Sequence, residues 1–284
     1  MAIKNFIPTV WSENLYSSLD NHYIAVKHCS REFEGDIKSC GSKVKICGVG
    51  DVAVYDYRNN TDLMDPSALS DTVTELEITE AKCFNFQIDD VDRVQSSPAL
   101  MNAALKKAAS ALATQADRYV FSLADQASIK CQSEASTGAE IIDALLDVRT
   151  KLMENNVLDP EDLVIEVSPA VATKILKEKI AISSDNSDAL EKGCVGNLFG
   201  CKIYVSNNIT QIVDDSYTLH KCVVRSKRAI AFAEQLSEIE AYRPELRFAD
   251  AVKGLYLYGA KVVYSNELAS VSFNLYHNDY NYED

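Results

Sequence analysis

The sequence lacks the features that mark membrane, secreted and zinc-binding proteins. No stretch reaches the roughly 18 consecutive apolar residues that span a bilayer, and residues 1–9 lack the basic and then apolar order of a signal peptide. The eight cysteines include no C-x-x-C pair, which excludes a zinc ribbon and a thioredoxin-type motif. We therefore expect a protein made in the cytosol whose cysteines stay free thiols.

Positive charge is also scarce. The chain has 28 lysines and arginines against 42 acidic residues, which gives a formal net charge of −14. A protein whose task is to hold nucleic acid through phosphate contacts needs a basic surface, so the net charge argues against that function. An acidic protein can still enclose nucleic acid, because a wall with little positive charge lets the polyanion slide.

Catalytic motifs are missing as well. There is no G-x-S-x-G or Walker loop, and the four histidines lie in no recognisable motif. The stretch Gly48-Val49-Gly50 lacks the third glycine and the following helix of a dinucleotide-binding turn. We therefore expect no catalytic residues, no cofactor and no enzyme activity.

A run of carboxylates follows a strand predicted at residues 83–88. It contains Asp89, Asp90 and Asp92, and carboxylates are the ligands that Ca²⁺ and Mg²⁺ prefer. The run lacks the glycine and the distal glutamate of an EF-hand loop. A solvated turn or a contact between subunits is favoured, so we assign no metal ligand and leave metal binding open.

A long amphipathic helix is predicted at residues 98–127. Ser97 can cap its N-terminus, Pro98 suits its first position, and no glycine or further proline interrupts it. A rod of about 45 Å usually serves as a strut, although it could also be an ordinary core helix. Spacings of four and three predict a buried stripe of Met101, Leu105, Ala108, Leu112, Ala116, Tyr119 and Leu123, opposite Lys107, Ser110, Thr114, Asp117, Arg118 and Asp125.

Two segments before this helix need a partner. Leu15, Leu19 and Tyr23 would lie on one face of a short helix, and residues 6–11 read as an extended apolar arm whose partner could be another subunit. Apolar and charged residues alternate in residues 31–57 and again in 73–79, which predicts a long β-hairpin. Because an isolated two-stranded ribbon is marginal in water, we expect neighbours to stabilise the hairpin.

The segments after the long helix predict a compact α/β domain. A small-residue linker at 133–138 suggests a domain junction, and an amphipathic helix follows with Ile141, Leu145, Val148 and Leu152 on one face. Ser168 should cap a second helix that begins at Pro169. Strands are expected at 163–167, 202–206, 218–225 and 229–233 in this domain, then at 252–263, before a tyrosine-rich acidic tail at 274–284.

Five stretches together resemble the major capsid proteins of tailed bacteriophages. They are FIPTVWS at 6–12, the hairpin from EGD at 34–36 to VKI at 44–46, KCFNFQIDDVD at 82–92 with Gln95, GNLFGCKIYVSNN at 196–208, and AVKGLYLYGA at 251–260. Each is weak alone, but together they occur in the order typical of that family. The resemblance covers residues 6–263.

The resemblance implies an α+β capsid fold, shared with encapsulins and with the floor of herpesvirus capsids. It assigns an N-terminal arm to residues 1–30, an extended hairpin loop to 31–82 and a peripheral domain to 83–136, whose spine helix is 98–127. An axial domain would span 137–240, and 241–284 would return to the peripheral domain and end in a tail. The arm and the hairpin then find their partners in adjacent subunits.

The function that the resemblance implies is construction of an icosahedral virion shell. Copies would form rings of five and six around double-stranded DNA, in the host cytoplasm, with portal and decoration proteins as further partners and no membrane. Because the chain begins at Met1 just before the arm, we expect a separate scaffolding protein. Intersubunit crosslinking stays open. The charged and aromatic candidates for intersubunit contacts are Phe6, Trp11, Arg31, Glu34, Asp36, Lys43, Lys45, Asp89, Asp90 and Asp92.

Two alternatives differ from a phage shell in their contents or their assembly. An encapsulin-like cellular compartment would use the same fold around an enzyme cargo. A cytosolic α/β enzyme would form no particle.

Overall fold

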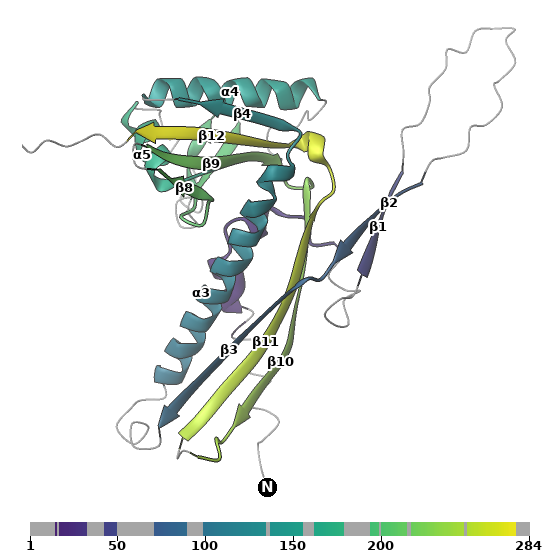
Figure 1. Cartoon of the computed structure of the whole chain (residues 1–284), viewed down its shortest axis with the longest axis vertical. Coiled ribbons are helices and arrows are strands. Elements are labelled where there is room, and N and C mark those ends of the chain that lie inside the picture. The colour runs from purple at the N-terminus through teal and green to yellow at the C-terminus, as the bar shows by residue number, and fades with distance from the viewer. Residues whose placement is uncertain are drawn as a thin grey trace, which may run out of the picture.

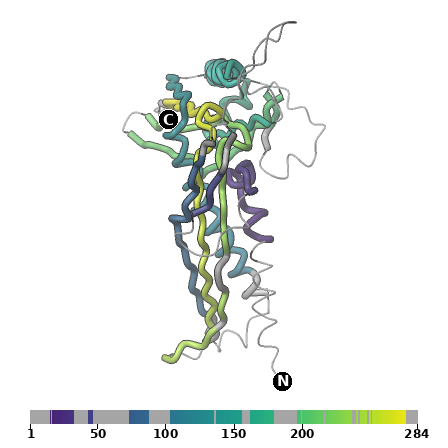
Figure 2. Tube along the Cα trace, turned by 90° about the vertical axis from the view of Figure 1, so that its right-hand side faces the viewer, coloured from purple at the N-terminus to yellow at the C-terminus, as the bar shows by residue number. Residues whose placement is uncertain are grey.

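In the computed structural model of the chain, the helix α3 (Ala99–Ser122) runs along a three-stranded sheet (Figure 1). The structure describes residues 15, 17–32, 43–49, 71–89, 99–134, 137–155, 162–178, 194–198, 200–214, 217–246 and 249–276. These residues form a long narrow unit and, at one end of it, a second unit built on a larger sheet (Figures 1 and 2). Among the described helices, none combines the length and apolarity that a membrane span needs.

The sheet of the long unit is antiparallel and uses strands from distant parts of the sequence. Its order is β10 (Ile230–Tyr242), β11 (Ala249–Val262) and β3 (Glu80–Asp89). The expected strands at 83–88 and 252–263 are therefore confirmed, and the structure shows that they are neighbours beside the long helix. Tyr256 and Tyr258 face the helix, whereas Leu255 and Leu257 face away from it, as their alternation predicts.

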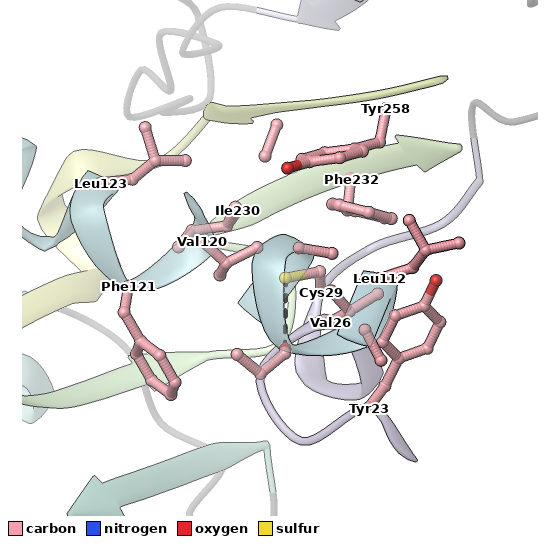
Figure 3. Close-up of a cluster of buried hydrophobic side chains, with 14 of the residues drawn as sticks. Tyr23, Val26, Cys29, Leu112, Val120, Phe121, Leu123, Ile230, Phe232 and Tyr258 are labelled. Atoms are coloured by element: carbon pink, nitrogen blue, oxygen red, sulfur yellow. Dashed lines mark hydrogen bonds between the residues drawn. The ribbon is translucent and has the colours of Figure 1, made fainter. Parts of the chain in front are cut away.

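The main core lies between α3 and this sheet, and Figure 3 shows part of it. Leu105, Leu112, Ala116 and Leu123 are buried as expected, and a short 3₁₀ turn, η3 (Leu123–Gln126), continues the helix. Asp117 was expected on the polar side and is completely buried instead. The buried arc is wider than a single stripe, because the N-terminal segment packs on α3 beside the sheet. Ala109, Ala113 and Val120 therefore lie in the core, while Ala108 and Tyr119 are only half-buried.

The N-terminal segment packs within its own chain. Residues 17–22 are helical, and a 3₁₀ turn, η1 (Val26–His28), follows. Leu15, Leu19 and Tyr23 share one buried face, as predicted, and contact the core around α3. For residues 15–29, the partner is thus the same subunit and not a neighbour, because α3 offers an apolar surface beside the sheet. Residues 6–11 of the arm lie outside the described residues.

The base of the predicted hairpin is also anchored in its own chain. It consists of β1 (Lys43–Val49) and β2 (Asp71–Glu77), which pair antiparallel from Lys43 opposite Glu77 to Val49 opposite Asp71. A small core joins it to the sheet face opposite α3, and its buried members are Val44, Ile46, Leu76, Ile78, Ala231, Ala233 and Leu257. The expectation that only an adjacent subunit stabilises the hairpin is therefore wrong for its base.

The second unit is a seven-stranded mixed sheet with two helices packed against one face. Its main order is β4 (Ile129–Ser133), β12 (Leu268–Tyr276), β9 (Tyr217–Ser226), β5 (Leu163–Val167), β7 (Cys201–Val205) and β6 (Cys194–Leu198), and β8 (Gln211–Val213) pairs with β9. The helices α4 (Gly138–Glu154) and α5 (Pro169–Lys177) bury their apolar faces on it, and Figure 1 shows α4 lying across the sheet. A 3₁₀ turn, η4 (Ser265–Glu267), precedes β12.

The predicted start of α5 is confirmed, and the cap of α4 is a further finding of the structure. Thr137 caps α4 in a capping box with Glu140, in which each side chain bonds the other residue's backbone N–H. Ser168 caps α5 by accepting a hydrogen bond of 3.4 Å from the backbone N–H of Val171, and Pro169 occupies the first turn. The Ser168 cap could be predicted from the sequence because it depends on residues only three positions apart.

The strands β4, β6, β8, β10 and β12 differ from the expected layout. The strand expected at 229–233 is the start of β10, which belongs to the sheet of the long unit. Only three residues separate β9 from β10, and the chain changes sheets between them. The strands β4, β6, β8 and β12 were not predicted. Of these, β4 and β12 pair in parallel in the larger sheet, so this unit begins before residue 137 and also includes residues 268–276, which were expected to return to the peripheral domain. The signal of β4 is weak because it is a short edge strand, half-buried on one face only.

Candidate assembly surfaces

The N-terminal segment is held to α3 by the buried carboxylate of Asp117. Its oxygens accept hydrogen bonds from the backbone N–H groups of Ile24 (3.1 Å), Ala25 (3.0 Å) and Val26 (3.1 Å). The side-chain amide of Asn208, between β7 and β8, lies 3.5 Å away. One side chain thus satisfies three backbone donors and fixes where the arm leaves the long helix.

A second buried group ties the same segment to the larger sheet. The guanidinium of Arg225 on β9 is fully buried and forms two parallel contacts, of 2.9 and 3.0 Å, with the carboxylate of Glu166 on β5. It also donates to the backbone carbonyls of Ala25 (2.8 Å) and His28 (3.2 Å). We call this cluster of Asp117, Glu166, Arg225 and residues 24–29 the joint, because it links the arm, α3 and both sheets.

His28 and Cys29 complete the joint without forming a His–Cys pair. The Nδ1 atom of His28 lies 3.2 Å from Oε1 of Glu166, and its ring packs on Tyr204 with a centroid distance of 4.1 Å. The thiol of Cys29 donates to the Ala25 carbonyl at 3.4 Å and accepts from Arg225 at 3.2 Å. Because burial raises the pKa of this thiol, it is not an activated nucleophile.

The two carboxylates of the joint titrate differently. Burial is the strongest influence on Asp117 and raises its pKa to about 6, although the Val26 and Ile24 N–H donors oppose the rise. Burial also disfavours the charged form of Glu166, but the Arg225 guanidinium and the His28 hydrogen bond together hold the pKa of Glu166 below its usual value. Glu166 is therefore ionised at neutral pH. Of the two carboxylates, Asp117 has the pKa closer to neutral pH.

Arg31, a candidate for intersubunit contact, is engaged within its own subunit. It forms ion pairs with Glu234 on β10 and with Asp20, the latter at 2.9 Å. Glu234 is buried and also accepts hydrogen bonds from the hydroxyl groups of Tyr23 and Tyr256. About a third of the Arg31 side chain stays exposed, so its main role in the isolated subunit is to hold the arm against the sheet.

The hairpin base presents a charged surface to solvent. Lys43 and Lys45 are exposed on the face opposite the buried Val44 and Ile46, as the alternation predicts. Lys43 lies 3.3 Å from the carboxylate of Glu75 on the neighbouring strand. Such exposed pairs contribute at most about 1 kcal/mol to stability, so these side chains are not needed for folding.

The other sequence candidates are not brought together by the described part of the structure. Asp89 ends β3, where its backbone pairs with Ala249. Phe6, Trp11, Glu34, Asp36, Asp90 and Asp92 lie outside the described residues. Within the described residues, no three His, Cys, Asp or Glu side chains gather closely enough to hold a metal ion. Cys29, Cys83, Cys131, Cys201 and Cys222 are free thiols.

The joint was not predicted from the sequence, although one signal for it exists. Glu166 interrupts the apolar run of β5, where every residue is buried, and a buried carboxylate needs a cationic or hydrogen-bonding partner. That reasoning predicts a buried cationic partner such as an arginine, but it does not identify which residue it is. Asp117 gave no such signal, because a single aspartate near Arg118 is ordinary on a solvated helix face.

Comparison with known proteins identifies the family. The family described as phage capsid protein matches residues 75–271. A solved chain from Mycobacterium phage Che8 is 28% identical, with a TM-score of 0.68, over 88% of this chain and 90% of that one. The capsid of Ralstonia phage GP4 is similar at 12% identity and a TM-score of 0.64, over 89% of this chain and 88% of that one.

A third solved structure has the same fold. It is the capsid of cyanophage P-SCSP1u, at 16% identity and a TM-score of 0.62, over 84% of this chain and 85% of that one. Comparison with curated proteins gives no match. The family match extends from the end of β2 into β12, so it covers most of both units and includes Asp117, Glu166 and Arg225 of the joint. The chain therefore belongs to the phage capsid protein family.

Proposed function

We propose that this major capsid protein of a tailed phage assembles with copies of itself into five- and six-membered rings, which tile an icosahedral shell around double-stranded DNA. The observation that carries the proposal is the family match over residues 75–271. A ring needs a heterologous contact, in which one surface of a subunit meets a different surface of the next and the rotation closes. No chemical step is required of the subunit, and no cofactor.

The shape of the subunit supports this assembly. The long unit has three layers, with α3 on one side of the sheet and the hairpin base on the other. Figure 1 shows β1 and β2 lying at an angle to the long axis of the three-stranded sheet. We assign the long unit to the peripheral domain, now including β10, and the second unit to the axial domain, now including β4 and β12.

The remaining assignments follow from that role. Residues 1–30 are the arm, and residues 31–82 contain the extended loop, with Lys43 and Lys45 as its contact candidates. Phe6, Trp11, Glu34, Asp36 and the acidic run from Asp89 stay candidates for intersubunit contact. Scaffolding, portal and decoration proteins are the expected partners, and assembly takes place in the host cytoplasm.

Electron microscopy of the protein, expressed with the genes that flank it in its source, tests the proposal. Closed icosahedral shells with rings of five and six are expected, filled with DNA when they are taken from the source. Shells that hold only protein cargo would favour a cellular compartment of the encapsulin type. A protein that stays monomeric under all assembly conditions would overturn the shell function.

A further inference from the structure

The exposed side of α3 carries positive charge only, although the chain as a whole is strongly acidic. The charged residues of the helix are Lys106, Lys107, Asp117 and Arg118. Asp117 is buried in the joint, whereas the three cationic side chains are exposed. In the part of the chain that the structure describes, none of these three has an ion-pair partner. In a protein with a net charge of −14, this side of α3 is an unneutralised basic surface.

The cations lie along one flat strip of the helix. Lys107 and Arg118 are separated by three helical turns, which places them on the same face about 17 Å apart, and Lys106 flanks them. The side chains between them are small, with Ala111 exposed and Thr114 half-buried. Over the same length, a DNA duplex presents roughly ten phosphate charges. A rigid polyanion can therefore approach the whole strip without a bulky side chain in the way.

The layer order places this strip on a broad face of the subunit. Ile230 and Phe232 of β10 point to α3, while Ala231 and Ala233 point to the hairpin base. Figure 2 shows the N-terminal segment on the same side of the sheet as α3. In a thin shell, one broad face of each subunit must face the interior. The face with unneutralised cations is the one suited to a polyanionic content.

We propose that the exposed side of α3 lines the interior of the shell, and that Lys106, Lys107 and Arg118 contact the phosphate backbone of the packaged DNA. This inference rests on the proposed function. No large exposed apolar side chain is found on the described part of α3. A docked protein segment usually needs such an anchor, whereas a DNA backbone does not. The same observation makes an acidic segment of a scaffolding protein the less suited occupant.

The proposed contacts between α3 and DNA phosphates are few, which is consistent with the negative net charge of the chain. Three cations per subunit bind a duplex weakly, and this binding weakens as salt rises. Summed over a shell, they hold the outermost layer of DNA in place. Each contact remains weak enough to break when the DNA leaves.

Lysine footprinting of intact particles tests the inference. Empty and DNA-filled shells are treated with a small acetylating reagent, and the labelling of Lys106 and Lys107 is compared by mass spectrometry. We expect labelling in filled shells to fall several-fold. Lys261, which is exposed on the hairpin side of the sheet, is the control and should label equally in both. Equal labelling of Lys106 and Lys107 in both particles would overturn the inference.

Two further outcomes separate the alternatives. Lys106 and Lys107 could be protected in particles that contain scaffold, lose this protection with the scaffold, and not regain it when DNA enters. That result would assign the strip to the scaffold. It would overturn the inference but leave the proposed function standing. Failure of the parent chain to form DNA-filled shells would overturn the proposed function and the inference with it.

A charge-matched pair of variants gives a second readout. One variant combines Lys106→Gln, Lys107→Gln and Arg118→Gln, and the control combines Lys130→Gln, Lys151→Gln and Lys177→Gln, which are exposed lysines of the second unit. We expect only the first variant to release DNA at a lower temperature and with a weaker dependence on salt. Identical release from both variants would contradict the proposal.

Discussion

At the scale of single residues, Asp117 shows how a side chain's role depends on what packs against its helix. Its position in the helical period is polar, and Arg118 beside it is exposed. The N-terminal segment covers Asp117 and supplies three backbone N–H donors. A buried carboxylate with backbone donors and no cation bonded to it is tolerated, but at a cost in free energy for its charged form.

The pH dependence of stability should report that cost. The ordinary pKa of 3.8 rises to about 6 in the native state, so the native protein binds the proton more tightly than the unfolded chain. The stabilising contribution of protonated Asp117 is therefore complete below about pH 4 and is lost as pH rises through 6. At about 1.4 kcal/mol per pKa unit, the loss is at most about 3 kcal/mol.

Urea denaturation of unassembled subunits between pH 4 and 7 measures this effect when the parent is compared with Asp117→Asn. We expect the parent to lose stability relative to the variant as pH rises through this range. Glu166 acts in the opposite direction, because its lowered pKa gives stability that is lost in acid, but it is present in both proteins and cancels. A constant difference across the range would contradict the effect of Asp117.

The ion pair of the joint should behave as a unit. Arg225→Met leaves the carboxylate of Glu166 buried without its main partner, and such a loss typically costs about 3 to 5 kcal/mol. Adding Glu166→Leu removes the stranded charge, so the double variant should recover part of the loss. It should not recover all of it, because the bonds from Arg225 to the Ala25 and His28 carbonyls stay broken. Equal unfolding midpoints for the single and double variants would show that the pair is not coupled.

At the scale of elements, α3 has two faces that respond differently to substitution. Leu112 is buried at the centre of the main core, and Leu112→Asp would place an unpaired charge there, at a cost of several kcal/mol. Because domains are stable by only about 5 to 15 kcal/mol, we expect this variant not to fold. Lys107→Ala, on the exposed side, should fold normally. Similar solubility and melting temperature for the two variants would refute the assignment of faces.

The contact between the hairpin base and the sheet depends on Gly259 of β11. A Cβ atom at this position would lie 2.3 Å from the backbone carbonyl oxygen of Glu77, at the end of β2. We expect Gly259→Ala to lift the hairpin base and to speed amide hydrogen exchange in β1 and β2. Gly254→Ala is the control, because the three atoms nearest to its Cβ would all belong to the ring of Phe84 on β3, and exchange in β1 and β2 should not change. Unchanged exchange in both variants would contradict this contact.

The elements that the sequence predicted well are those fixed by local signals. The long helix, the helix at Ser168 and the alternation of the hairpin each depend on residues within a few positions of one another. The strands β4, β10 and β12 depend on which sheet they join, and that is decided by distant partners. Predicting the joint needs both local signals and knowledge of which distant residues meet. Glu166 reveals that a partner is needed, and only the fold identifies Arg225.

At the scale of the whole molecule, the hairpin belongs partly to the subunit and, in our proposal, partly to the assembly. Its base is packed on Ala231, Ala233 and Leu257, so removing the whole hairpin would expose a patch of core. Replacing residues 38–76 with a flexible linker should therefore destabilise the subunit. That deletion cannot test assembly alone, because loss of shells would also follow from loss of folding.

A shorter replacement separates the two roles. Val49 and Asp71 lie directly opposite each other in the antiparallel pair, so residues 50–70 can be replaced by the two-residue turn Asn-Gly. Val44, Ile46, Leu76 and Ile78 keep their places on the sheet, and we expect the parent's unfolding midpoint and helix content. With its scaffold, the shortened chain should sediment as subunits or small rings, whereas the parent sediments as shells. Shells of normal size would show that residues 50–70 are not the intersubunit brace, and a failure to fold would place them in the subunit's own core.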